Sequence, residues 1–402
     1  MDFKFEIQEE TRRGARIKVI GVGGGGSNAV GRMFEAGLEG VEFYVMNTDS
    51  QALENSNVPN KIQIGAKITH GLGAGSDPEL GRRAALEDTE RILSILEGAD
   101  LVFVTAGLGG GTGAGAAPVV ASLAKSLDAL TIAIVTKPFG FEGAKRMRQA
   151  ESSVNDLAES VDILTTIPND RLLSLAPRGT GMKQAFRLAD EVLRQAVEGI
   201  SEIILTPGLI NLDFSDIRAA ILGMGHALIG NASATGDDGA IEAARKAINS
   251  PLLEDTKIRG ARQVLLNITA SREIGLHEMN EACSLIREAC GSDDTHVSFG
   301  VIEKPGLGDE VRVTVIATGF PAAPPVPREP AIEALPAEDF FAPRDTTTAA
   351  AAGAPATPPA PPAASAEPEP VMAAAAVGGP ASHTFDDELD VPAYLRQGKL
   401  LG

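Results

Sequence analysis

Residues 16–37, RIKVIGVGGGGSNAVGRMFEAG, and residues 100–123, DLVFVTAGLGGGTGAGAAPVVASL, decide the fold. In both stretches a run of β-branched and other apolar residues leads into a cluster of glycines, and a helical pattern follows. Glycine lets backbone N–H groups approach a ligand closely, and a helix N-terminus favours negative charge. A strand, a glycine loop and a helix in this order therefore predict an α/β protein that binds phosphate.

The same alternation of strand and helix continues on both sides of these two stretches. Short β-rich runs stand at residues 41–48, 61–65, 130–138 and 161–167. Helical patterns lie between most of them, and we expect residues 78–98 to form a single helix. Repeated strand–helix units predict a mainly parallel sheet covered on both faces. The expected fold class is thus α/β, with a Rossmann-like, parallel-sheet nucleotide-binding domain at residues 16–181.

A long helical pattern covers residues 182–205, where apolar residues recur at three- and four-residue spacing. The sequence TPG ends it, so we place a domain boundary after Leu205 and predict that the helix connects two domains. A second, smaller α+β domain is expected at residues 206–320. Its elements are a helix from Phe214, a strand at 225–235, a helix near 238–249, a strand at 263–271, a helix near 276–289, and strands at 296–304 and 309–319. The last two flank PGLGD, which predicts a hairpin.

The two ends of the chain differ in composition from these domains. We expect residues 1–15 to form a flexible N-terminal segment. Residues 321–382 hold 15 of the 25 prolines and few large apolar groups, so they cannot bury enough surface to offset chain entropy. We expect a disordered linker there. Residues 383–402 regain charges and apolar anchors such as Leu389 and Tyr394, which is typical of a short partner-binding tail.

Composition excludes several classes of function. The 402 residues carry a formal net charge of −19, which disfavours broad binding to nucleic acid or anionic lipid. No run approaches the roughly 18 apolar residues of a membrane span, and no secretory leader is recognisable, so we expect a cytoplasmic protein without direct membrane insertion. The two cysteines, Cys283 and Cys290, are about 10.5 Å apart on a helix, too far for a disulfide. No residue pattern indicates a protein metal site.

A third glycine loop, GLGAGS at residues 71–76, indicates which nucleotide is bound. A dinucleotide-binding domain needs one glycine loop, whereas several loops at one sheet edge suggest a triphosphate held from more than one side. GxxxxGK[ST] is absent, which excludes the P-loop family. The GxGxxG match at Gly21, Gly23 and Gly26 leaves one alternative open, a non-polymerising NAD(P)-dependent oxidoreductase.

Seven motifs together resemble one family. GGGTGAG at 109–115 matches the tubulin-type signature. The chain as a whole is similar to the bacterial cell-division GTPases of the tubulin/FtsZ family through GVGGGGSNAV (21–30), NTDSQAL (47–53), GLGAGSDPELG (71–81), KPFGFEGAKR (137–146), IPNDRLL (167–173) and GLINLDFSDI (208–217). The order of these motifs along the chain is that of the family, so we expect GTP or GDP as ligand, with Mg²⁺.

The resemblance implies a set of nucleotide contacts. The phosphate loops would be Gly24, Gly25, Gly26, Ser27 and Asn28, then Gly73, Ala74 and Gly75, then Gly111, Thr112 and Gly113. Glu142 and Arg146 would contact ribose and phosphate, and Phe186 would lie against the base. Asn169 and Asp190 would read the base, because a carboxylate accepts the N1–H and N2–H of guanine. Without the family context, Asp190 would be an ordinary charge on a helix surface.

NLDFSD at residues 211–216 has two interpretations. On the residues alone, Asp213 and Asp216 would stabilise a helix start as its N-cap and third residue. The resemblance implies instead that Asn211, Asp213 and Asp216 enter the nucleotide site of the next subunit, where the aspartates position water for hydrolysis. Head-to-tail contacts between different faces build filaments. The family expectation is therefore a homopolymer that forms a ring beneath the membrane at midcell, with the tail bound to membrane-tethering adaptors.

Overall fold

The glycine-rich stretches lie beside the central strands of a seven-stranded sheet. The computed structural model describes residues 14–175, 177, 179–250, 258–271, 274–291 and 295–320, all within one of the two units into which the chain divides. The strand order is β3-β2-β1-β4-β5-β6-β7, and every pairing is parallel. The strands are β1 (Ile17–Val22), β2 (Val41–Asn47), β3 (Asn60–Gln63), β4 (Leu101–Gly107), β5 (Leu130–Lys137), β6 (Ile163–Pro168) and β7 (Gly225–His226). The predicted Rossmann-like domain is confirmed.

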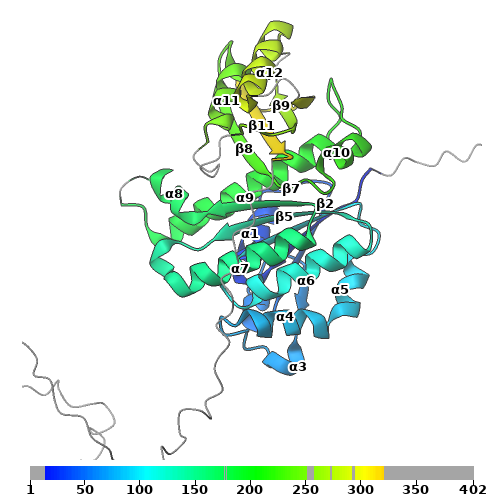
Figure 1. Cartoon of the computed structure of the whole chain (residues 1–402), viewed down its shortest axis with the longest axis vertical. Coiled ribbons are helices and arrows are strands. Elements are labelled where there is room, and N and C mark those ends of the chain that lie inside the picture. Colours follow the sequence, from blue (N-terminus) through cyan, green and yellow to red (C-terminus); the bar gives the residue numbers. More distant parts are fainter. Residues whose placement is uncertain are drawn as a thin grey trace, which may run out of the picture. The chain divides into compact units, whose positions relative to one another are not determined.

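Helices cover both faces of this sheet (Figure 1). One face packs against α1 (Gly23–Glu35) and α9 (Met182–Leu205). The other packs against α4 (Pro78–Glu87), α5 (Thr89–Leu96), α6 (Thr112–Ser126) and α7 (Ala144–Ser160). Shorter helices complete the domain: α2 (Ser50–Glu54), α3 (Ala66–Thr69), the 3₁₀ turn η1 (Gly140–Glu142) and α8 (Asn169–Leu175).

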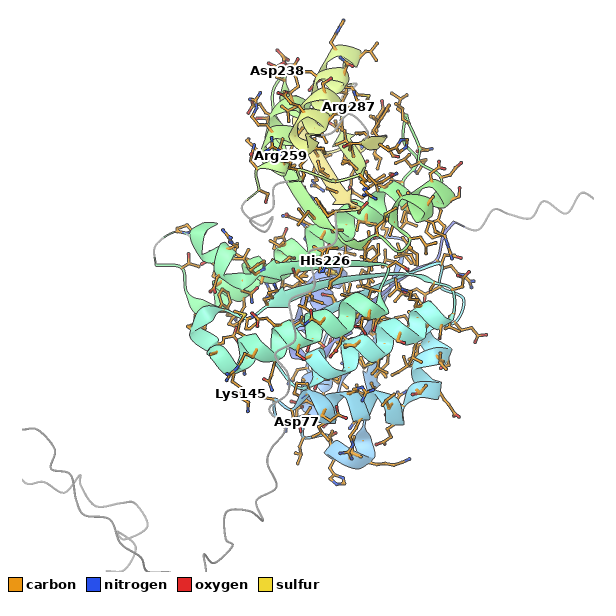
Figure 2. All side chains as sticks on the ribbon, in the orientation of Figure 1. Asp77, Lys145, His226, Asp238, Arg259 and Arg287 are labelled. Carbon is orange, nitrogen blue, oxygen red and sulfur yellow. The ribbon has the colours of Figure 1, made fainter. Side chains whose placement is uncertain are left out.

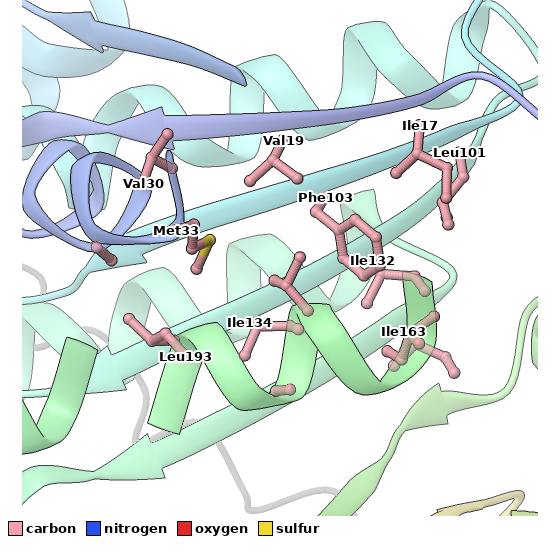
Figure 3. Close-up of a cluster of buried hydrophobic side chains, with 14 of the residues drawn as sticks. Ile17, Val19, Val30, Met33, Leu101, Phe103, Ile132, Ile134, Ile163 and Leu193 are labelled. Atoms are coloured by element: carbon pink, nitrogen blue, oxygen red, sulfur yellow. The ribbon is translucent and has the colours of Figure 1, made fainter. Parts of the chain in front are cut away.

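The strands are buried on both faces because their side chains alternate between the two helical layers. Ile17 and Val19 of β1 point to α1 and α9, while Ile20 and Val22 point to the other layer. Figure 3 shows the first of these cores, where Val30 and Met33 of α1 and Leu193 of α9 meet side chains of β1, β4 and β5. Burial on both faces explains why the sequences of these strands are nearly continuous runs of apolar residues.

The predicted helix over residues 78–98 is wrong in one respect, because two helices occupy it. Asp88 separates α4 from α5 with backbone angles of φ −105° and ψ 25°, outside the helical range. Its carboxylate accepts a hydrogen bond from the Gly65 N–H at 2.7 Å. This side-chain contact with a distant backbone group accompanies the break, and propensity along 78–98 alone does not show it.

A second sheet has four strands in the order β10-β9-β11-β8. Its elements are α10 (Phe214–Ile221), β8 (Leu228–Thr235), α11 (Gly239–Ile248), β9 (Gln263–Ala270), α12 (Leu276–Cys290), β10 (His296–Glu303) and β11 (Glu310–Thr318). The predicted smaller domain with strands and helices is confirmed, but the hairpin is wrong. β10 pairs with β9 in parallel, and β11 pairs antiparallel with β9 and β8. β9 lies between them because it is almost wholly buried and needs backbone partners on both edges.

The expected strand at residues 225–235 is divided between the two sheets. β7 pairs with β6 of the first sheet, and β8 pairs with β11 of the second. Ala227 stands between them, where its N–H donates to the Leu164 carbonyl at 3.0 Å and its own carbonyl accepts from the Thr165 hydroxyl. One extended run therefore joins the two sheets. The domain boundary that we placed after Leu205 stays a prediction.

α9 contacts both sheets. Its buried face includes Leu193, Val197 and Ile200, which share one core with strands of the first sheet and with Leu265 and Ile316 of the second. At Gly199 a Cβ atom would lie 2.7 Å from the Thr314 methyl, so only glycine allows this approach to β11.

Some of the predicted segments lie outside the described residues. The expected linker at 321–382, the tail at 383–402 and most of the segment at 1–15 lie there. Within the described ranges, Cys283 and Cys290 are free thiols. In that same part of the chain, no helix combines the length and the apolar character that crossing a membrane requires.

Glycines let α4 and α6 pack backbone to backbone. A Cβ at Gly115 would overlap the Pro78 carbonyl oxygen, and one at Gly81 would overlap the Gly111 carbonyl oxygen. In contrast, a Cβ at Gly31 of α1 would meet only the Asn57 side-chain amide, at 2.9 Å. An amide at the end of a side chain can move aside more easily than a helix backbone can.

Gly115→Ala should therefore destabilise the fold although alanine is the better helix former. Alanine gains about 1 kcal/mol in helix propensity, but forcing α4 away from α6 costs about 1–3 kcal/mol or more. Gly31→Ala, also within a helix, should be neutral or slightly stabilising. Denaturant unfolding of both variants measures the difference, and equal stabilities would contradict the close packing of α4 on α6.

Candidate functional site

The carboxyl ends of the parallel strands bring the three glycine loops into contact. A Cβ at Gly23 would lie 2.7 Å from the Gly113 backbone nitrogen, and one at Gly25 would lie 3.1 Å from the Gly107 Cα. A Cβ at Gly111 would lie 2.8 Å from the Ala74 methyl. The first and second loops therefore touch, and so do the second and third. Ligands of open α/β sheets bind at this edge.

Two helices direct their N-termini at these loops. α1 begins at Gly23, so Gly24, Gly25 and Gly26 form its first turn instead of preceding it. α6 begins at Thr112, with Gly111 as its N-cap. Neither helix has a side-chain cap or an acidic residue in its first turn. Their uncapped N–H groups and positive ends therefore favour an anion between them.

The third loop, Gly71–Ser76, approaches the other two from the side of α4. Gly73 and Gly75 have positive φ angles of 85° and 57°, which L-residues rarely adopt. Asp77, labelled in Figure 2 where α4 begins, caps that helix by accepting from the Glu79 N–H at 3.0 Å. Ala74 is buried against the second loop. The structure thus places Ala74 beside Gly111, with Gly73 and Gly75 as its neighbours in the loop.

A cleft of about 990 Å³ lies between α1 and α9. Its α1 wall includes Gly24, Ser27 and Asn28, and its α9 wall includes Phe186 and Asp190. The structure therefore brings together the predicted first phosphate loop and two of the predicted base contacts, which are about 160 residues apart in the sequence. A cleft of this size is within the range that holds small ligands.

Asp190 is the most perturbed acid in this cleft. It is 8% exposed and is paired with Arg32 of α1, whose Nε lies 3.1 Å from the carboxylate. Burial raises the pKa of Asp190 to about 6, although the positive charge of Arg32 lowers it. Sequence reasoning missed Arg32. Asp190 and Arg32 come together only because α1 packs on α9.

Among the buried polar atoms that have no hydrogen-bond partner in the described part of the chain are Ser27 Oγ in α1 and Asn169 Oδ1, where α8 begins. Such atoms cost free energy unless a ligand or water satisfies them. Both belong to residues that we predicted to contact the nucleotide. These unpaired atoms and the glycine cradle fit a ligand that has phosphates and a base with polar groups.

Glu142 and Arg146 lie beside the second glycine loop. Glu142 accepts a hydrogen bond from the Phe139 N–H at 2.9 Å, and its other oxygen pairs with the Arg146 guanidinium. A Cβ at Gly109 would be 2.8 Å from the Arg146 carbonyl oxygen, so α7 starts against the loop. Phe186 meets Phe139 edge to face at 5.2 Å between ring centroids. This aromatic contact connects the α9 wall to the turn that holds Glu142.

The end of β2 supplies site residues that we did not predict. Thr48 Oγ1 lies 2.7 Å from Thr112 Oγ1, and both residues are buried. Asn47 Oδ1 accepts from the N–H groups of Thr48 and Asp49 and so fixes this turn. The sequence did indicate that these residues belong to the site. NTD stands where a strand of the parallel sheet ends, so it must lie at the same end of the sheet as the glycine loops.

The acidic segment NLDFSD is not at this edge. Arg218 of α10 binds Asp128 through its carboxylate at 2.8 Å, and Asp128 precedes the start of β5. α10 is therefore beside the amino end of β5, whereas the glycine loops follow the carboxyl ends of β1 and β4. Asn211, Asp213 and Asp216 are exposed there. The structure does not bring them to the nucleotide cleft of the same chain.

The helix-capping interpretation of this segment has limited support. Asp213 is the N-cap residue of α10, but its side chain makes no capping hydrogen bond. Asn211 Oδ1 does accept a hydrogen bond from the Gly208 N–H and so shapes the loop.

No cluster of three or more His, Cys, Asp or Glu side chains suited to a metal occurs in the described ranges.

Two parts of the chain match known families. Residues 16–177 match the Tubulin/FtsZ family, GTPase domain, and residues 225–321 match the FtsZ family, C-terminal domain. These two regions correspond to the parts that contain the parallel sheet and the mixed sheet.

Solved structures show the same fold. FtsZ of M. jannaschii, described as an empty dimer, is 40% identical with a TM-score of 0.72, and the match covers 77% of this chain and 89% of that one. CetZ1 of Haloferax volcanii, a GDP-bound monomer, is 24% identical with a TM-score of 0.67, covering 77% and 96%. CetZ2 of the same organism, a GTPγS-bound protofilament, is 24% identical with a TM-score of 0.67, covering 77% and 94%. The likeness to the two CetZ proteins supports the fold alone.

Asp190→Asn should stabilise the fold at neutral pH. The pKa of Asp190 is about 6 in the folded chain and 3.8 as its ordinary value, so folding disfavours the ionised form. The penalty is small below about pH 4, grows as the pH rises, and reaches roughly 2–3 kcal/mol above pH 6. Unfolding of both proteins by denaturant from pH 4.5 to 8 should show a growing advantage for the variant. A constant difference would contradict the raised pKa.

Proposed function

The chain belongs to the tubulin/FtsZ family, and on that basis we propose that it binds and hydrolyses GTP, polymerises head to tail, and forms the ring at the bacterial division site. GTP binding and a cytoskeletal role follow from the family. Hydrolysis that depends on assembly, the Z-ring role and the bacterial origin are the finer parts of the proposal. The NAD(P)-dependent oxidoreductase is not favoured, because both matched regions belong to this family.

The observation that carries the proposal is the separation of two regions along the strands of one sheet. The nucleotide cleft lies at the carboxyl ends of these strands, and the acidic segment lies at their amino ends. β5 has eight residues and α9 has 24, which correspond to about 26 Å and 36 Å. Asp213 and Asp216 therefore cannot reach a phosphate held by the glycine loops of their own chain. A second copy placed above the first, with the same orientation, would bring its acidic edge to the first copy's nucleotide edge.

In this arrangement each group has a defined role. The N-termini of α1 and α6 and the loop at 73–75 would hold the phosphates. Asp190 would accept the N1–H and N2–H of guanine, Asn169 would use its unpaired oxygen or its amide at the base, and Phe186 would cover the base face. Glu142 and Arg146 would contact ribose and phosphate. Arg32 would help keep Asp190 ionised and ready to accept.

The incoming copy would supply the hydrolytic groups. Asp213 and Asp216, both exposed, would position the attacking water, with Asn211 shaping the loop that carries them. Mg²⁺, when bound, would neutralise charge on the phosphates. Such an ion would be held mainly by the phosphates, as is common for Mg²⁺.

A head-to-tail contact uses two different faces and does not close on itself, so it builds filaments. The M. jannaschii FtsZ structure described as an empty dimer agrees with self-association. We further propose that the tail at 383–402 binds membrane-tethering adaptors, with 321–382 as a tether, and that the filaments form a cytoplasmic ring at midcell. The acidic chain would bind neither nucleic acid nor, by itself, the membrane interior.

Asp190→Ala should lose the preference for GTP over ATP. A mismatch at a buried polar group costs about 1–3 kcal/mol, so the preference should fall by roughly 10- to 100-fold. Glu191→Ala is the matched control, because the neighbouring carboxylate is already held by Arg194. Competition binding with both nucleotides measures the ratio. An unchanged ratio in Asp190→Ala would refute the role of Asp190 in reading the base.

A mixture of two inactive variants should recover hydrolysis if the site is shared. Asp216→Ala should bind GTP and assemble but hydrolyse slowly. Gly111→Ser should bind GTP poorly, because its Cβ would lie 2.8 Å from Ala74 and 2.9 Å from the Asp77 nitrogen, yet it keeps its acidic segment. In mixed filaments the second protein can present Asp216 to GTP held by the first. Phosphate release measures the recovery.

Co-sedimentation of the two variants must be followed in the same mixture. Recovery should rise with the fraction of mixed filaments. If both variants enter filaments and no phosphate is released, the shared site is wrong and Asp216 has only a structural role.

A further inference from the structure

We propose that Thr48 is a positioning residue for the nucleotide phosphates, acting through the hydroxyl of Thr112. This inference rests on the proposed GTP site. It assigns a role to Thr48, which would not itself contact the ligand and which the sequence did not indicate. Its basis is the buried hydroxyl pair that joins the end of β2 to the start of α6.

The pair is short and shielded from water. Thr48 Oγ1 and Thr112 Oγ1 are 2.7 Å apart, and the two residues are 0% and 9% exposed. A distance of 2.7 Å is typical of a full O–H···O hydrogen bond. Because water has so little access to the pair, a hydroxyl that loses its partner there is not readily compensated by solvent.

The backbone of Thr48 is fixed on both sides. Its N–H donates to Asn47 Oδ1 at 2.9 Å, and its carbonyl accepts from the Thr69 hydroxyl at 3.4 Å. The Thr69 hydroxyl shares its one proton between this carbonyl and the nearer Gly65 carbonyl at 2.9 Å, so its contact with Thr48 is the weaker of the two. The turn after β2 and the helix α3 therefore hold Thr48 in place while it contacts Thr112.

Thr112 stands where the phosphate is expected. Thr112 is the first residue of α6. A Cβ atom placed on Gly23 would lie 3.4 Å from the Cβ of Thr112. The first glycine loop and the α6 N-terminus thus meet at this side chain. The only polar group on Thr112 that can be reoriented is its hydroxyl.

The number of available protons determines the direction of the hydrogen bond between Thr48 and Thr112. A phosphate oxygen is an acceptor only, and a hydroxyl has one proton to donate. When Thr112 donates its proton to phosphate, it can only accept from Thr48, so Thr48 must be the donor between them. Without ligand, either hydroxyl can donate. Nucleotide binding would therefore select one direction, and the Thr48 proton would hold the Thr112 hydroxyl in its donating orientation.

Thr48→Val tests this role because valine keeps the shape and removes the hydroxyl. Affinity for GTP and GDP should fall about ten-fold, the scale of one buried hydrogen bond coupled to a charged group. Affinity for guanosine, which has no phosphate, should stay unchanged. A general distortion of the site would weaken all three. Thr48→Ser should restore most of the nucleotide affinity.

Thr105→Val is the matched control. Thr105 is a buried threonine of β4, a strand of the same sheet, and its hydroxyl has no hydrogen-bond partner among the described residues. Its replacement removes the same group from the same sheet without breaking a bond, so GTP affinity should be unchanged. Thermal unfolding of each variant verifies that the chain is folded at the temperature of the binding assay.

A double-mutant cycle with Thr112→Val decides whether Thr48 acts through Thr112. If it does, the double variant should bind GTP no more weakly than Thr112→Val alone. Additive losses would overturn the proposal, and so would equal GTP affinity for Thr48→Val and the unaltered chain. Failure of the unaltered chain to bind GTP would instead refute the proposed function, so the two failures are distinguishable.

Discussion

Close approach of backbone to backbone is the constraint on which the rest of the structure depends. Gly23 faces Gly113, Gly111 faces Ala74, and Gly81 faces Gly111, at separations that leave no room for a side chain. These contacts bring α1, α4 and α6 to one edge of the sheet and direct two helix N-termini at the same space. The packing that holds the layers together is therefore also what concentrates N–H groups for an anion. Stability and binding share the same glycines.

Three buried groups among the predicted nucleotide contacts lower the stability of the chain. Asp190 is buried with a raised pKa, and Ser27 and Asn169 each leave a buried oxygen unpaired. Each of these lowers the free energy of unfolding in the absence of ligand, because buried polar groups without partners are unfavourable. A ligand with matching donors would relieve all three. The site is thus prepared for a ligand at the expense of the empty protein's stability.

α9 links this cleft to the second sheet. Asp190 and Phe186 occupy its first turns, whereas Gly199 packs directly on β11 near Thr314. Ion pairs of Glu198 with Arg312 and Glu202 with Lys304 join the later turns to the second sheet. Since the helix is rigid and about 36 Å long, it holds the nucleotide edge and the acidic segment apart. That separation is the physical reason for proposing that two chains together complete a hydrolytic site.

The sequence by itself determined the elements and their class. Continuous apolar runs such as β4 and β5 require burial on both faces, and the three-to-four spacing along α9 requires one buried face, so the parallel sheet and the long helix could be predicted. The glycine loops and the family motifs pointed to the cleft residues on α1 and α9. These signals are local, because each depends on residues within a few turns of one another.

Only the tertiary structure decided which elements became neighbours. β9 separates β10 from β11, and Ala227 divides one extended run between two sheets. The Asp88 contact with Gly65 accompanies a helix break that the local sequence does not indicate. The pairs Arg32–Asp190 and Thr48–Thr112 likewise join residues far apart in the chain. Such contacts form when buried backbone and polar groups find partners across the fold, and local sequence patterns carry no record of which partner is near.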